Sequence, residues 1–259
     1  MKKRAEILNG RTKKIVFRTL SVILALLIWQ LISMKVGMEL LLASPFEVVK
    51  RLFSIWAEPA FFSTVFFTLL RIMTGFLLAF VAGTVLGFLS HRFKAAEILL
   101  WPYVITVRSV PIASIIILCL IWLSFDQLTV FISFLIAFPV IYSNVLTGLK
   151  ATGSEMTELA KLYKVKWKNR LVYIYLPQIK PFLISACSTS IGMAWKAGVA
   201  AEVIGVIKGS VGERLYDSKI YLMTADLFAW TIMIVVISVI LEKLFILLLK
   251  SVYRGVVKL

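Results

Sequence analysis

The chain has 259 residues, of which 61% are hydrophobic and only 16% are charged. Soluble domains contain about 45–50% apolar and about 25% charged residues, so this composition excludes a water-soluble enzyme and a disordered chain. A net charge of +16 alone would suggest a nucleic-acid binder, but a mean hydropathy of +0.96 is far too high for that class. Both cysteines lie in apolar runs, which indicates neither a disulfide framework nor a metal site. A polytopic membrane protein remains.

Six long apolar stretches are comparable to the roughly 20 residues that a helix needs to cross a bilayer. In chain order they are 19–34, 59–90, 98–125, 127–149, 181–201 and 227–249. Single cations interrupt three of them, at Arg71, Arg108 and Lys196. The sequence therefore predicts an all-α fold with six transmembrane helices. A basic segment over 1–18 precedes one transmembrane domain over 19–259.

The basic residues predict the orientation of these helices. If the N-terminus is inside, the inner segments 1–18, 91–97, 150–180 and 242–259 hold 20 Lys or Arg. The outer segments 35–58, 124–127 and 202–226 hold 6. Such an excess of cations on one side predicts that both termini are cytoplasmic and that the basic segments meet anionic lipid. The first apolar stretch is expected to be an uncleaved helix, because no small-residue cleavage site follows it.

Small residues recur every four positions in the second stretch, at Gly75, Ala79, Gly83 and Gly87. A stripe of this kind lets another helix approach closely in a membrane, so we expect it to serve helix packing. Arg71 lies one turn before Gly75 on the same face and is expected to point into the bundle.

The cations inside the spans are candidates for a translocation pathway, because charges in a membrane are costly to bury. Arg71, Arg108 and Lys196 could line a cavity for an anionic solute, or each could bond backbone carbonyls or reach toward water. Lys196, beside Trp195, is the stronger candidate for solute contact. Glu202 could pair with Lys196 only if the helix is kinked, since six residues separate them. The spans hold no deep acid or histidine, which argues against a proton-driven carrier.

Residues 150–180 form the longest predicted cytoplasmic loop between spans. Helix formers predict a short helix over 154–163, and a second helix is expected over 166–174 before Pro177 opens the fifth span. The first helix is amphipathic. It is therefore expected to dock a soluble partner or to lie on the membrane surface.

The loop resembles the EAA loop of bacterial ABC importer permeases, with the pattern E-A-A, three residues, G, nine residues and I-x-L-P. The residues that the resemblance assigns to ATPase coupling are Glu158, Leu159, Ala160, Lys164, Val165, Ile174, Leu176 and Pro177. Leu159 stands where the pattern has its second-position Ala, and Lys164 stands where it has Gly. The sequence leaves open whether Lys164 adopts the left-handed turn that Gly adopts easily.

The resemblance extends from about residue 42 to 242 and is closest to permeases of the nitrate, sulfonate and taurine type. The matching segments are Leu42–Pro45, Thr68–Arg71 with Gly75-Phe76, Arg108–Pro111, Gly192–Trp195, Val199–Gly205 and Asp226–Ala229. In that family, Arg, Arg and Glu are common at the positions of Arg71, Arg108 and Glu202, whereas Lys196 is not a family position.

The resemblance implies a type I ABC importer permease fold in a bacterial inner membrane. It also implies a second permease copy, two ATP-binding-cassette ATPase subunits and an extracytoplasmic solute-binding protein. The chain has no Gly-Lys dipeptide and hence no phosphate-binding loop, so ATP is expected on the partner subunit and no cofactor or metal on this chain. The expected solute is a sulfonate, a nitrate-like anion or a vitamin precursor. The rival interpretation is a membrane scaffold or receptor subunit that recruits a different cytoplasmic partner.

Overall fold

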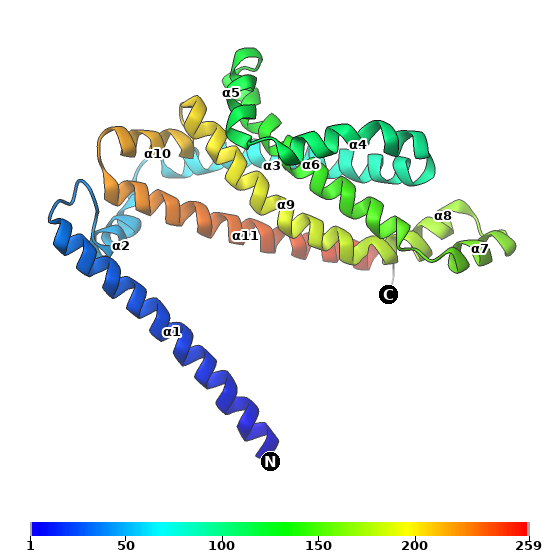
Figure 1. The fold of residues 1–259 in the computed structure, drawn as a ribbon, viewed down its shortest axis with the longest axis horizontal. Helices are drawn as coiled ribbons and strands as arrows, with labels where there is room; N and C mark the ends of the chain where they lie inside the picture. Colours follow the sequence, from blue (N-terminus) through cyan, green and yellow to red (C-terminus); the bar gives the residue numbers. More distant parts are fainter. Residues whose placement is uncertain (1, 258–259) are drawn as a thin grey trace. The chain divides into compact units, whose positions relative to one another are not determined.

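The computed structural model describes the backbone of residues 2–257 and the side chains of residues 16–153, 156 and 158–255. Within this part the fold is all-helical and contains no strand, as the sequence predicts (Figure 1). In chain order the elements are α1 (Lys2–Val36), α2 (Pro45–Ser54), the 3₁₀ turn η1 (Ile55–Ala57), α3 (Phe61–Arg92), α4 (Lys94–Ser109), α5 (Ile112–Trp122), α6 (Phe125–Lys150), α7 (Ser154–Leu162), α8 (Trp167–Arg170), the π-helical turn η2 (Leu171–Tyr175), α9 (Leu176–Gly205), α10 (Val211–Ile220) and α11 (Thr224–Val257).

Four helical segments of the described chain are long and apolar enough to cross a membrane: Val16–Val36, Phe61–Arg92, Phe125–Lys150 and Thr224–Gly255. A fifth crossing results if α4 and α5 together form one broken span. These helices support a multi-pass membrane protein, but they do not confirm the predicted count of six. The missing helix is α9, which contains the predicted fifth span and is not among these segments.

The composition of α9 explains why it differs from the other spans. Its 30 residues extend about 45 Å at a rise of about 1.5 Å per residue, which is long enough to cross a bilayer. However, small and polar residues take the place of apolar ones along its buried face, including Ser190, Gly198 and Glu202. A helix enclosed by other helices contacts little lipid, so small and polar residues are tolerated where they meet a neighbour.

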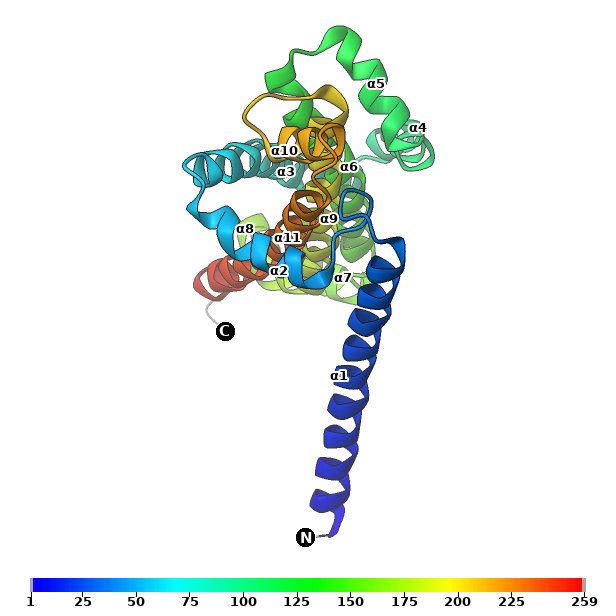
Figure 2. The ribbon, with the colours of Figure 1, turned by 90° about the vertical axis from the view of Figure 1, so that its left-hand side faces the viewer.

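The predicted continuous span over 98–125 is wrong in one respect, because the chain breaks into α4 and α5 with a bend of 109° (Figure 2). The break lies at Val110 and Pro111. Proline has no N–H to continue the helix, and its ring pushes the preceding residue into an extended conformation. Val110 accordingly has φ −81° and ψ 134°.

The larger of two compact units comprises Phe62–Tyr216 and the chain from Met233 onward, and α6 and α9 form its centre. The two helices run side by side in opposite directions (Figure 1). Gly148 of α6 faces Phe182 of α9 at one end, and Gly205 of α9 faces Leu128 of α6 at the other. This antiparallel pairing is the direction that the predicted topology requires for consecutive crossings.

The small-residue stripe of α3 lies against α6 in the same unit. A Cβ atom added to Gly75, Gly83 or Gly87 would lie within 3.0 Å of atoms of α6. The fourth residue of the stripe, Ala79, is fully buried. Gly75 is nearest to Val130, and the later glycines meet progressively later residues of α6, so the two helices run parallel. A backbone approach this close requires residues with little or no side chain.

The smaller unit comprises the chain up to Phe61 together with Asp217–Ile232. Figure 2 shows that the chain turns after α1 and enters α2. Ser44 begins α2 with a capping box, in which its hydroxyl accepts from the Glu47 N–H and the Glu47 carboxylate accepts from the Ser44 N–H. The ring of Trp29 in α1 lies 5.0 Å from that of Phe228, which places α1 against the start of α11 within this unit.

Candidate coupling and translocation sites

The predicted coupling loop forms a helical hairpin between α6 and α9 (Figure 1). After α7 ends at Leu162, Lys164 adopts a left-handed conformation with φ 48°. The Val165 N–H donates to the Ala160 carbonyl at 2.9 Å and the Lys164 N–H donates to the Lys161 carbonyl at 3.0 Å, which is the Schellman pattern of helix endings. Lys164 therefore makes the turn that glycine would make, at a cost of about 1–2 kcal/mol of backbone strain.

The second helix of the hairpin differs from its prediction over 166–174. α8 covers only four residues, and the π-helical turn η2 continues it directly into α9, with the Leu176 N–H donating to the Leu171 carbonyl five residues back. Pro177 lies in the first turn of α9 and has no N–H, so a regular α-helical bond cannot form there. Ile174, Leu176 and Pro177 are each half-buried and connect the hairpin to the bundle core.

The exposed side of α7 carries large apolar side chains. Met156, Leu159, Leu162 and Tyr163 are between 50% and 75% exposed, and we call these four residues the coupling surface. Ala160, by contrast, is buried on the inner side of the helix. Apolar side chains so open on a short amphipathic helix are typical of a docking surface. Glu158 lies beside them and is also exposed.

Arg71 is held by an ion pair that the sequence did not predict. Its guanidinium pairs with Asp126 in the first turn of α6 and stacks on the Phe67 ring, 3.8 Å from the ring centre. Only 14% of the Arg71 side chain is exposed, so it points into the bundle as expected. The carboxylate of Asp126 thus neutralises one of the three cations proposed for the pathway.

Glu202 is fully buried and holds the start of α10 in place. Its carboxylate accepts from the Thr68 hydroxyl at 2.8 Å and from the Gly212 N–H at 3.3 Å. The same hydroxyl accepts from the Val211 N–H at 3.0 Å. A Cβ on Gly212 would stand 2.3 Å from that of Glu202, so glycine is required for this approach. A carboxylate at a helix N-terminus is stabilised by the unpaired N–H groups there.

The remaining pathway candidates are not brought together. Arg108 donates to the Pro139 carbonyl of α6 at 3.0 Å, Trp195 is fully buried and Lys196 is exposed. Within the described chain no ion pair joins Lys196 to Glu202, so the pairing considered from the sequence is not seen. Arg71 and Arg108 are instead held separately by α6.

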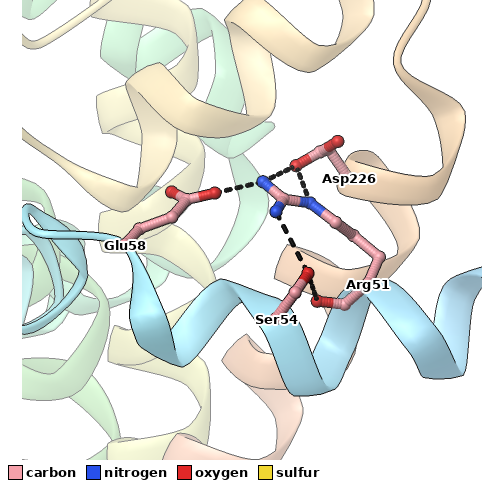
Figure 3. Close-up of polar contacts among 4 residues, drawn as sticks. All are labelled: Arg51, Ser54, Glu58 and Asp226. Carbon is pink, nitrogen blue, oxygen red and sulfur yellow. Dashed lines mark hydrogen bonds and ion pairs between the residues drawn. The ribbon is translucent and has the colours of Figure 1, made fainter.

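Sequence reasoning also missed a cluster of charges in the smaller unit (Figure 3). The Arg51 guanidinium donates from Nε to Asp226 Oδ1 at 2.6 Å, and its Nη2 forms a further ion pair with Glu58. Nη1 also donates to the Ser54 hydroxyl at 3.2 Å. The cluster ties α2 to the start of α11 within this unit. Because 175 residues separate Arg51 from Asp226, no local pattern could have revealed the contact.

The environment keeps Arg51 charged. Burial alone would lower the pKa of the guanidinium, but the hydrogen bonds and charges of Asp226 and Glu58 outweigh burial and raise that pKa above its ordinary value.

Cys119 and Cys187 are both buried free thiols. Among the described residues no group of three or more His, Cys, Asp or Glu could hold a metal ion.

Comparison with known proteins identifies the group to which these features belong. The family model described as "Binding-protein-dependent transport system inner membrane component" matches residues 75–258. A putative aliphatic sulfonates transport permease protein, SsuC, of Bacillus subtilis (strain 168) is 27% identical over 82% of this chain and 77% of its own length. The nitrate import permease protein NrtB of Synechococcus elongatus is 26% identical over 74% of this chain and 72% of its own.

Two further similarities extend the comparison. The formylaminopyrimidine transport permease protein ThiX of Halalkalibacterium halodurans is 23% identical over 74% of this chain and 76% of its own length. A crystal structure of an amino acid ABC transporter with histidines has a TM-score of 0.55, with 20% identity, over 76% of this chain and 94% of the matched chain. At that identity the structural match bears on the fold alone.

Proposed function

The chain belongs to the family of binding-protein-dependent transport system inner membrane components. We propose that it is the permease subunit of an ATP-driven importer for a small solute. ATP acts on a separate pair of ATPase subunits, and the chain binds no cofactor itself. The transporter contains a second copy of this permease and receives its solute from an extracytoplasmic binding protein. It resides in the bacterial inner membrane.

The coupling surface is the observation that carries this proposal. It presents large apolar side chains on a hairpin that is joined to α9 without a break through η2. A partner that grips α7 can therefore move α9, whose buried face lies at the centre of the larger unit. Closure of two ATPases around ATP would bring the hairpins of two permease copies together. This movement would open the transmembrane bundle toward the outer side of the membrane. The energy enters through the difference in ATPase affinity between the two states.

We further propose that α9 completes a set of six crossings with both termini in the cytoplasm. The parallel direction of α3 and α6 and the antiparallel direction of α6 and α9 support this arrangement. A green fluorescent protein fused to the C-terminus should fluoresce, because the fusion folds only in the cytoplasm. Fluorescence lost in the whole chain but regained after deletion of α11 would contradict the topology.

The solute belongs to the class of small anions or vitamin precursors. Three curated relatives are named for aliphatic sulfonates, nitrate and formylaminopyrimidine, and they are similar to this chain over most of its length. Arg108 and Lys196, which no carboxylate neutralises in the described chain, support an anion. Uptake of labelled methanesulfonate, nitrate and formylaminopyrimidine by proteoliposomes that contain the assembled transporter would identify the class.

Capture of the ATPase tests the coupling assignment directly. Leu159→Asp places a charge in the centre of the coupling surface, and Glu158→Lys reverses the adjacent charge. Both should abolish co-purification of the ATPase subunits and uptake. Phe53→Asp is the matched control, since it charges an apolar residue that is even more exposed, in a segment predicted to lie outside the cell. ATPase capture that survives both α7 variants would remove the coupling assignment and favour a scaffold with another partner.

A further inference from the structure

A basic cavity of about 640 Å³ lies between the end of α3, both helices of the coupling hairpin and η2. Three permanent cations line it, Arg92, Lys161 and Arg170, and none of the described residues around it is a carboxylate. Three cations converging without a counter-charge repel one another. Such an arrangement indicates a site that is completed by an anion.

Two polar groups in the wall of the basic cavity lack partners. Arg170 Nε and Thr152 Oγ1 are both buried, and neither forms a hydrogen bond within the described chain. A buried donor without a partner is costly, so native structures usually provide it with a ligand or water. Glu97 does not line the cavity, and its carboxylate accepts from Lys94 and Lys150 instead.

Aromatic rings form the rest of the wall. The ring of Tyr175 lies 5.8 Å from those of His91 and of Trp167, and the Arg170 guanidinium lies 6.0 Å from the Trp167 ring centre. α3 ends and α9 begins at this level, so the cavity lies where the chain leaves and re-enters the apolar layer. Tyrosine and tryptophan are enriched at that depth because their rings are amphipathic.

We propose that the basic cavity binds the phosphate group of an anionic ligand, with the headgroup of an anionic phospholipid as its principal source. Basic pockets between transmembrane helices on the cytoplasmic side are suited to lipid headgroups. A phosphate offers several acceptor oxygens, which Arg170 Nε and its neighbouring cations can share. The inference uses the proposed cytoplasmic placement of the hairpin but not the identity of the solute or of the ATPase. Because Lys161 lies on α7 itself, bound lipid would also fix the hairpin in its docking geometry.

Native mass spectrometry of the full-length chain from nanodiscs tests the site. When the wild-type chain is released from discs that contain phosphatidylcholine and phosphatidylglycerol, we expect phosphatidylglycerol to stay bound to it. Lys161→Gln and Arg170→Gln should each reduce the retained fraction about fivefold, as expected for removal of one cation near an anionic surface. Arg170→Lys keeps the positive charge but not the Nε donor, so it should restore part of the retention. Lys168→Gln is the control, because it removes an exposed cation of the same loop that does not line the cavity.

Inorganic phosphate distinguishes the two sources of the ligand. If phosphate displaces phosphatidylglycerol, the site takes free phosphate as well; if it does not, the site is selective for the lipid, and both results support a phosphate site. Lys161 is exposed, so its variant should fold even if Arg170→Gln does not. Equal lipid retention by Lys161→Gln, Lys168→Gln and the wild type would overturn the proposal. Unchanged lipid retention with weakened ATPase capture would likewise overturn it, because the anion would then be a carboxylate of the partner protein.

Discussion

The packing of α3 on α6 can be tested by adding a single methyl group at Gly75. In Gly75→Ala the new Cβ would stand 2.2 Å from the Val130 carbonyl oxygen and 2.9 Å from the Ser133 Cβ. Atoms in ordinary contact lie about 3.5–4.0 Å apart, so the helices must separate locally by about 1 Å. Because backbone atoms cannot rotate away, we take the upper end of the usual overpacking cost, about 3 kcal/mol. Alanine returns about 1 kcal/mol through its helix propensity, which leaves a net loss of about 2 kcal/mol.

The two buried cysteines supply the assay. A fluorogenic thiol reagent reacts with Cys119 and Cys187 only when unfolding exposes them, so a thermal ramp of the detergent-solubilised protein reports Tm. A loss of about 2 kcal/mol should lower Tm by roughly 4–8 °C in a chain of this size.

The matched control is Gly192→Ala. It adds the same methyl group in α9, where no atom beyond the neighbouring residues and backbone of the same helix lies within 4 Å of the new Cβ, and should leave Tm unchanged or slightly higher. Equal Tm values for the Gly75 and Gly192 variants would refute the close approach of α3 and α6.

Three other predictions concern polar contacts and the coupling turn. Arg51→Gln should destabilise the protein by about 1 kcal/mol, because it leaves two carboxylates without their cation, whereas the adjacent exposed Lys50→Gln should have no effect in the same thermal assay. Lys164→Gly should relieve the left-handed strain and slow amide hydrogen exchange in the coupling turn about fivefold; faster exchange would contradict the observed φ. Glu202→Gln should preserve uptake because the amide oxygen still accepts from Thr68, whereas Glu202→Ala should abolish it and lower stability by about 1–3 kcal/mol. If Glu202→Gln also abolished uptake, the negative charge of the carboxylate itself would be required.

Features that depend on one helix and its immediate neighbours were predictable from the sequence. The four-residue spacing of Gly75, Ala79, Gly83 and Gly87 defines a face whatever helix covers it, and α7 follows from local helix formers. The identity of the covering helix was not predictable. Nothing in the stripe distinguishes α6 from any other span, because a small residue indicates that a neighbouring helix approaches closely but not which helix it is.

Features that depend on distant contacts were missed for a related reason. The pairs Arg71–Asp126 and Arg51–Asp226 join residues 55 and 175 positions apart, and each carboxylate alone reads as an ordinary helix-start residue. The predicted count of six spans is not confirmed. By composition α9 is not among the helices apolar enough to count as a span, because small and polar residues such as Ser190 and Glu202 lie on its buried face.

The structure also changes which cations can act on a solute. A cation inside a span attracts an anionic solute most strongly where the protein itself does not neutralise its charge. Asp126 neutralises Arg71, so Arg71 is better explained as a clamp between α3 and α6. Arg108 donates to a neutral carbonyl, and neither Arg108 nor Lys196 forms an ion pair within the described chain. Of the three cations inside the predicted spans, Arg108 and Lys196 are therefore the two left without a carboxylate partner in the described chain, the first beside the break at Pro111 and the second next to the buried Trp195.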